Sequence, residues 1–434
     1  MKKIHFLWLL LSAKGALTQP FVFTPGNLAV VRVGSPDSAL PTSSSPVFLE
    51  EFTPAGVLIQ SILFPLTGDR KLTLSGRSST EGQLRLSGNG MYLTLGGYNL
   101  FPGTSSVTSA GTAAGRSIAR VDSLGIIDVP IILPIDKLYP NASFRSVVTN
   151  DGNSGYWTAG GTRGVYFVKE AVDTSVIVCN TVTNTRNINL FNGELYLTHG
   201  SGVVNTRVMK VGEGLPDTSG VEAIPLPGIP FNNASVSDVF FADIVPAQAG
   251  PEMMYLADEL HGLVKYSLVD GTWTSNGIAG SAADNYRAVT GTFFGTGTLL
   301  YATRKGGSGA TGGGEFVRII DTAGYNQPFA PLIDLISIAE SNTAFRGVAK
   351  VPGVNALLQK VYVFNGNGNW EDPANWMNSE IPLTVTKKGD VILILPTASG
   401  VCSINSMVTI APAVSLIVPT GVQLNVNGNL EIME

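Results

Sequence analysis

One sequence unit recurs along most of this chain and constrains its fold more than any other feature. Each copy has a short apolar segment, often aromatic-Arg-x-Val, then a Gly/Asn/Asp turn, a Leu-Tyr segment, a segment alternating Val and Tyr with polar residues, and a weaker fourth segment. Alternation with period two is typical of half-buried β-strands. Equivalent first-segment positions lie 41, 51, 50 and 59 residues apart, at Arg145, Arg186, Ser237, Arg287 and Arg346. Because one four-stranded blade has this length, the sequence predicts an all-β fold whose main body is a β-propeller.

The ends of the repeat array predict how the ring closes. Phe345-Arg346-Gly347-Val348 has the form of a first strand, yet no further strands of a blade follow it. The segments Leu28–Val33, Val47–Phe52 and 57–64 have the form of outer strands that no first strand precedes. Joining the two sets makes one composite blade from both ends of the array, which leaves no exposed sheet edge.

The number of blades follows from the number of first strands. Counting one near Leu84 together with the five equivalent positions predicts six blades. Seven blades remain the alternative, because the segment 101–115 is long enough to contain further strands. Helical periodicity is nearly absent, and the segment 331–339 is the one place where it predicts a short helix.

The beginning of the chain predicts export. Lys2 and Lys3 precede the apolar run 4–11, and small residues including Ala13 and Gly15 follow, so residues 1–15 form a predicted signal peptide. That run is too short to span a membrane, and no other stretch approaches the roughly 18 apolar residues that a span needs. We therefore expect an extracellular or cell-surface protein without an integral membrane span.

Charge and cysteine content narrow the partners and the covalent chemistry. Charged residues make up 14% of the chain, and removal of residues 1–15 leaves 24 basic against 32 acidic residues, a net charge of −8. An acidic surface disfavours nucleic acid as a partner. Cys179 and Cys402 lie in different predicted domains and form no CxxC motif, so we expect two buried free thiols, with a disulfide between docked domains as the alternative.

Several segments resemble an uncharacterised group of secreted bacterial propeller-like proteins. They are Pro25-Gly26-Asn27-Leu28-Ala29-Val30-Val31-Arg32-Val33-Gly34, Pro46-Val47-Phe48-Leu49-Glu50-Glu51-Phe52 and Phe345-Arg346-Gly347-Val348. The resemblance covers residues 24–353. It implies export and a propeller, and it brings no activity with it.

The sequence changes character after Gly353, which marks a second predicted domain at residues 362–434. Gly368-Asn369-Trp370 and Asp372-Pro373-Ala374-Asn375-Trp376 are followed by short apolar segments between Gly and Pro turns. Closely spaced strands with little charge predict a small β-solenoid or a β-sandwich. The two-tryptophan pattern resembles a module of surface and secreted proteins of Bacteroidetes-type bacteria, which implies a surface location and no particular reaction.

Two sets of side chains are candidate ligand-binding residues. Because the first strands of a propeller line its channel, Arg145, Arg186, Arg287 and Arg346 predict a cationic ring that pairs with an acidic sugar such as a uronate or sialate. The alternative is that each arginine ties its blade to a neighbour. Trp370 and Trp376 predict a surface that stacks on a sugar ring, and the alternative is that they fill the core of the C-terminal module.

Other residue types give weaker indications. The tyrosines at one repeated strand position predict packing between blades; they are Tyr156, Tyr196, Tyr255 and Tyr301. Outside the predicted signal peptide the histidines are His199 and His261, without metal-ligand or triad spacing, so we predict no metal and no cofactor. Four carboxylates could form a glycosidase pair only if they met at one mouth of the channel, and solvated loop positions are the alternative; they are Asp238, Asp243, Asp258 and Glu259.

These observations favour a secreted or cell-surface binding or adhesion protein without catalytic activity. Its expected partner is a glycan or an extracellular protein. The alternative is a polysaccharide-active hydrolase or lyase that uses the propeller channel, which is an analogy at the level of the fold.

Overall fold

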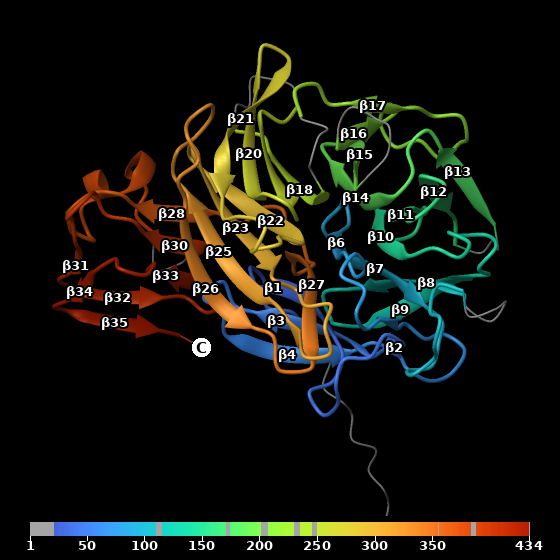
Figure 1. The fold of residues 1–434 in the computed structure, drawn as a ribbon. Coiled ribbons are helices and arrows are strands. Elements are labelled where there is room, and N and C mark those ends of the chain that lie inside the picture. The colour runs from blue at the N-terminus through green and yellow to red at the C-terminus, as the bar shows by residue number, and fades with distance from the viewer. Residues whose placement is uncertain are drawn as a thin grey trace, which may run out of the picture.

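The computed structural model describes residues 21–109, 115–170, 174–200, 207–229, 235–244, 250–354, 356–382 and 388–433. Six sheets are arranged in a ring, and a smaller module lies beside them (Figure 1). The predicted signal peptide lies outside the described residues. Within the described ranges, no helix is long and apolar enough to cross a membrane.

Five blades are antiparallel sheets of four consecutive strands. Blade 1 contains β6 (Arg85–Leu86), β7 (Leu93–Tyr98), β8 (Arg116–Val121) and β9 (Ile127–Leu133). Blade 2 contains β10 (Phe144–Thr149), β11 (Tyr156–Gly160), β12 (Val165–Val168) and β13 (Ser175–Cys179). Blade 3 contains β14 (Thr185–Phe191), β15 (Glu194–His199), β16 (Val208–Val211) and β17 (Ala223–Pro225). Blade 4 contains β18 (Val236–Ala242), β19 (Met253–Asp258), β20 (Gly262–Val269) and β21 (Thr272–Ala279). Blade 5 contains β22 (Ala288–Phe294), β23 (Gly297–Arg304), β25 (Glu315–Asp321) and β26 (Leu332–Ile338).

Blade 6 joins the two ends of the propeller. Its strands are β27 (Thr343–Lys350), β1 (Leu28–Val33), β3 (Val47–Phe52) and β4 (Leu58–Leu63), and the short β24 (Gly312–Gly313) adds a parallel edge to β27. Ala29 pairs with Ala349, and Val33 pairs with Ala344. The short strands β2 (Ser44–Ser45) and β5 (Leu74–Ser75) pair outside the blades. The predicted six blades and the predicted closure by both ends are confirmed, and the segment 101–115 adds no strand to a blade in the residues described there.

The predicted helix at 331–339 is wrong, because this segment is the outer strand β26. Its residues pair with β25 from Glu315↔Ile338 to Ile320↔Leu332. Buried and exposed residues do not alternate strictly along β26. The segment therefore lacks the period of two that predicts a strand, and its apolar spacing resembles that of a helix. The free edge of β25 offers a full ladder of hydrogen bonds to this segment, and tertiary pairing of this kind overrides a weak local pattern.

The core consists of six apolar layers, one between each pair of neighbouring blades. The four tyrosines of the repeated position are all buried in these layers, as predicted; they are Tyr156, Tyr196, Tyr255 and Tyr301. Tyr255 also donates a hydrogen bond of 2.7 Å from its hydroxyl to Asp321, and Lys265 pairs with the same carboxylate at 2.7 Å. Blades are therefore joined chiefly by apolar contact, with a few buried polar links.

The C-terminal module is a β-solenoid. Its strands are β28 (Val361–Phe364), β29 (Gly368–Asn369), β30 (Val391–Ile394), β31 (Cys402–Ile404), β32 (Met407–Ile410), β33 (Ser415–Ile417), β34 (Leu424–Val426) and β35 (Asn429–Ile432). They form three parallel sheets, ordered β28-β30-β33, β29-β31-β34 and β32-β35. Parallel pairing between successive coils is the arrangement of a solenoid, whereas the sandwich alternative is built from antiparallel sheets.

The solenoid packs against the propeller, where Figure 1 shows it beside β25 and β26. Val363, Val391 and Leu393 belong to the same apolar cluster as Tyr301 and Phe316 of blade 5. The two thiols stay free and buried, as predicted, with Cys179 in blade 2 and Cys402 in the solenoid. The docked modules thus share a core without a covalent link between these cysteines.

Gly347 is a position where the fold requires glycine. A Cβ atom built there would lie 2.3 Å from the backbone nitrogen of Leu84 and 2.5 Å from the carbonyl oxygen of Gly82. The neighbouring first strands of blades 6 and 1 approach each other this closely at the channel. We expect Gly347→Ala to lower the free energy of unfolding by about 2 kcal/mol or more, since overpacked backbone must shift. Urea denaturation of the two proteins measures this loss, and an unchanged midpoint would contradict the close approach.

Candidate functional site

The channel of the propeller is divided by a layer of buried polar side chains. Asp238 of blade 4 accepts a hydrogen bond of 2.6 Å from Arg85 of blade 1, on the opposite side of the ring. Asp238 also accepts bonds from Asn187 of blade 3 and from the backbone N–H groups of Val239 (2.7 Å) and Val289 (2.9 Å). Both partners of the ion pair are buried, so this layer, which we call the channel network, crosses the channel.

Further bonds extend the channel network to other blades. Ser146 of blade 2 donates to the side-chain oxygen of Asn187 at 2.7 Å. Gln83 accepts from Arg85 at 3.0 Å and donates to the carbonyl oxygen of Arg287 at 2.9 Å. Burial raises the pKa of Asp238, and the Arg85 charge opposes that rise. The predicted solvated loop position is wrong for Asp238, which is a fully buried link between blades, and for Asp258, which is buried at the end of β19.

The four predicted arginines lie at the end of the channel where the first strands begin, and we call this end the arginine mouth. In β10 and β14 the ladder shifts register across Arg145 and Arg186, and Arg346 falls within the irregularity of β27. Arg287 directly precedes β22. A bulge changes the direction of the side chain that it removes from the regular ladder. Because the irregularity recurs in the first strands, the repeat places these guanidinium groups at equivalent positions.

Three of the four arginines are held by the scaffold. Arg346 is 2% exposed and donates at 3.1 Å to the carbonyl oxygens of Gly76, Ser78 and Gly307. Arg145 is buried and donates to the side chain of Asn184 at 2.7 Å and to the carbonyl oxygen of Thr185 at 2.9 Å, while Arg287 is buried and pairs with Glu259. These contacts agree with the alternative prediction, in which the arginines tie neighbouring segments together.

Arg186 differs from the other three. It is partly exposed, and no hydrogen bond or ion pair of its guanidinium joins it to any described residue. Its Nε atom is sheltered from solvent and has no hydrogen-bond partner. This Nε atom lies against Gly200, because a Cβ atom built at that glycine would be only 2.3 Å from it. Arg186 is therefore the arginine of the mouth that keeps its donors available.

The positive charges of the arginine mouth act on one another. Burial and the Arg186 charge lower the pKa of Arg145 to about 10. Burial and the Arg287 charge lower the pKa of Arg346 to about 10. Burial lowers the pKa of Arg287 as well, and Glu259 opposes this. The charge of Arg186 therefore acts on Arg145 and that of Arg287 acts on Arg346, while Glu259 offsets part of the positive charge of the mouth.

Two of the remaining carboxylates lie together, because Ser235 donates to Asp258 at 3.0 Å and to Glu259 at 3.3 Å, whereas Asp243 lies apart from them. Glu259 accepts from Ser237 at 2.6 Å beside its Arg287 partner, and the adjacent Asp258 accepts from His261 at 2.9 Å. Asp243 lies on the far side of the channel network, where it accepts from Asn192 at 3.0 Å. His199 is buried next to Arg207. Among the described residues, no group of three or more His, Cys, Asp and Glu side chains could hold a metal ion.

Beyond the channel network, the first strands end around a cavity of about 700 Å³, which we call the channel cavity. Phe191, Phe240 and Phe293 contribute aromatic walls, and Lys350 of blade 6 lines the same space. Polar side chains of the lining include amides and hydroxyls; they are Ser87, Asn150, Asn189, Asn192, Thr290 and Thr292. Sequence reasoning missed this cavity, because its phenylalanines follow the repeated first-strand position at a different distance in each blade and its polar residues differ in type.

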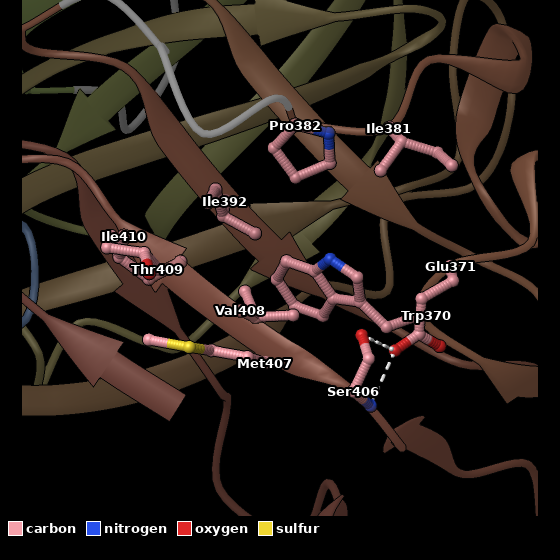
Figure 2. Close-up of a pocket in the computed structure, with 10 residues that line it drawn as sticks. All are labelled: Trp370, Glu371, Ile381, Pro382, Ile392, Ser406, Met407, Val408, Thr409 and Ile410. Carbon is pink, nitrogen blue, oxygen red and sulfur yellow. Dashed lines mark hydrogen bonds between the residues drawn. The ribbon is translucent and has the colours of Figure 1, made fainter. Parts of the chain in front are cut away.

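A smaller pocket of about 270 Å³ lies on the solenoid, and Figure 2 shows it. The indole of Trp370 points into it between Val408 and Ile392, while Glu371 bonds to Ser406 at 2.7 Å and 3.0 Å. Only 3% of Trp370 is exposed. The pocket therefore offers an apolar wall with little of the indole face free for stacking.

The second tryptophan lies deeper in the solenoid. Trp376 is 2% exposed, crosses Trp370 edge to face at 4.7 Å and donates from its Nε1 to the Trp370 carbonyl oxygen at 2.6 Å. Asp372 caps the 3-10 turn η2 (Pro373–Asn375), which a second turn, η3 (Met377–Ser379), follows after Trp376. The two-tryptophan pattern thus builds the first coil and its core, which is the packing alternative for these residues.

No protein-family model and no curated protein matches this sequence. One similar solved structure is a protein from Bacteroides fragilis NCTC 9343 that is provisionally described as a 6-phosphogluconolactonase. The comparison covers 71% of this chain and 82% of that one, with 11% identical residues and a TM-score of 0.38. The fold assignment rests on the six sheets of the ring.

Proposed function

We propose that this chain is an exported binding protein, without catalytic activity, that recognises an acidic glycan at the arginine mouth. The observation that carries the proposal is Arg186, a partly exposed residue whose guanidinium has no partner among the described residues and lies beside two further arginines. A planar guanidinium pairs with a carboxylate through two parallel hydrogen bonds, which is the chemistry of uronate or sialate recognition.

The scaffold supports this role for Arg186. Arg145 is fixed by neutral acceptors and adds positive potential without moving, whereas Glu259 balances the charge of Arg287. Only the Arg186 side chain would have to be ordered when an acid binds, because the other guanidinium groups are already fixed. The bound acid therefore gains charge pairing at a small cost in side-chain entropy. The secreted location and the glycan class come from the sequence and are part of the proposal.

We expect Arg186→Gln to weaken binding of an acidic oligosaccharide at least about tenfold, because a hydrogen bond to a charged group contributes about 1.5–3 kcal/mol. The measurement is calorimetric titration of residues 16–434 with a galacturonate trimer and a sialyl trisaccharide, with a neutral trisaccharide as reference. Arg120→Gln is the matched control, because Arg120 lies in β8 of blade 1 and pairs with Asp128 of the same blade and with Glu170, which follows β12 of blade 2. Equal affinity of the Arg186→Gln protein, or no binding of either acidic sugar, would overturn the proposal.

A further inference from the structure

We propose that the channel cavity is a second binding site, one for an organic anion with an apolar body, and that Lys350 pairs with the negative charge of that ligand. The site lies across the channel network from the arginine mouth, and nothing in the proposed glycan recognition uses it. Its volume of about 700 Å³ falls in the usual range of small-molecule sites.

The walls of the cavity fit an apolar body. Phe191, Phe240 and Phe293 come from the first strands of blades 3, 4 and 5, so aromatic surface is supplied from three successive blades. Phe293 is 48% exposed although it is large and apolar. Exposed aromatic surface gathered inside a concave space is typical of a ligand site.

Lys350 is the cation of the cavity that keeps no partner. No hydrogen bond or ion pair joins its amine to any of the described residues, and it stands where β27 ends. Asp238 balances the charge of Arg85, while Asp243 keeps its negative charge, accepts a hydrogen bond from the neutral Asn192 and forms no ion pair with Lys350. The strands that pack against β27 are β1, β6, β22, β23 and β24, and among them only β6 presents a charged side chain to the cavity, that of Arg85. A ligand anion is therefore the partner that the cavity lacks.

The titration of Lys350 gives the site a pH dependence. Burial lowers the pKa of Lys350 to about 8. An anion binds to the protonated amine, so its affinity is present below that pKa and is lost as the pH rises above it. With a sulfonate ligand, which stays charged throughout, any loss of affinity between pH 7 and 9.5 comes from the protein.

The test uses two fluorescent probes of similar shape with residues 16–434. One is 8-anilinonaphthalene-1-sulfonate, an anion, and the other is N-phenyl-1-naphthylamine, which is neutral. We expect the anion to bind more weakly at pH 9.5 than at pH 7. Lys350→Met is expected to weaken anion binding at least tenfold at pH 7 and to remove its pH dependence. The neutral probe is expected to bind both proteins equally. Phe293→Ala is expected to weaken both probes.

Two control variants test whether the loss of probe binding is specific to Lys350. Lys169→Met removes an exposed lysine of blade 2 that pairs with Asp217, and Arg186→Gln changes the arginine mouth; both are expected to leave probe binding unchanged. Near-ultraviolet circular dichroism shows that each variant keeps the native packing. Anion binding that Lys350→Met leaves intact, or that falls equally in Lys169→Met, would overturn the proposal, and so would the absence of binding by either probe.

Discussion

Replacing Asp238 by alanine is expected to lower the free energy of unfolding by about 3–5 kcal/mol, the loss seen when one partner of a buried ion pair is removed. The substitution leaves the buried Arg85 guanidinium without its counter-charge and removes acceptors from Asn187 and two backbone N–H groups. These groups come from four strands around the ring, so the loss falls on the closed propeller as a whole. Urea denaturation followed by circular dichroism measures it.

Two further proteins separate pairing from burial. Asp128→Ala removes a half-exposed partner of Arg120 and is expected to cost about 1 kcal/mol or less, as for surface ion pairs. The double variant Arg85→Met with Asp238→Leu replaces the pair by apolar groups and is expected to lose less than Asp238→Ala alone. If Asp238→Ala and Asp128→Ala had equal effects, the channel network would not hold the ring together.

The repeat made the propeller predictable because structural roles recur with the blade. A bulge at the start of the first strand and a tyrosine in the second strand occupy equivalent places in several blades, so they appear as a periodic pattern. Closure was predictable for the same reason, since Phe345-Arg346-Gly347-Val348 matched the first strands of other blades. The six layers of apolar side chains then follow from alternation along each strand.

The channel network could not be predicted in this way. Ser146, Asn187 and Asp238 each follow the repeated arginine position by one residue, but they differ in type because each meets a different partner. Arg85 and Asp238 are 153 positions apart, and only the closed ring brings them together. The channel cavity could not be predicted either, since its phenylalanines occupy different positions of the repeat and only the closed ring brings them together.

The arginine mouth shows that a residue repeated in the sequence can have different contacts in each blade. Its four arginines share one sequence position, yet three are occupied by Asn184, by Glu259 and by backbone carbonyl oxygens. Whether a repeated arginine is available to a ligand depends on the loops that pass beside it, which differ in length and sequence from blade to blade. Arg186 stands out only when those neighbours are placed.

Replacing Trp376 by alanine is expected to lower the free energy of unfolding by about 3–5 kcal/mol, the usual loss for a buried tryptophan. The ring packs edge to face against Phe364 and Trp370, at 5.4 Å and 4.7 Å between centroids, and its removal leaves a void in the first coil. Trp376→Phe keeps an aromatic ring and loses the 2.6 Å bond to Trp370, so a loss nearer to 1 kcal/mol is expected. Chemical denaturation followed by circular dichroism compares the two.

Hydrogen exchange of the Trp376→Ala protein tests how far the damage spreads. Val363 and Leu393 of the solenoid share an apolar cluster with Tyr301 and Phe316 of blade 5, so loosening the first coil should speed exchange in β28, in β30 and in the neighbouring strands of blade 5. Blades 2 and 3 make no contribution to that cluster and should keep their protection. Faster exchange confined to the solenoid would instead mean that the two modules open independently. A tryptophan that served chiefly for ligand stacking would leave exchange unchanged throughout, because its loss would disturb no packed neighbour.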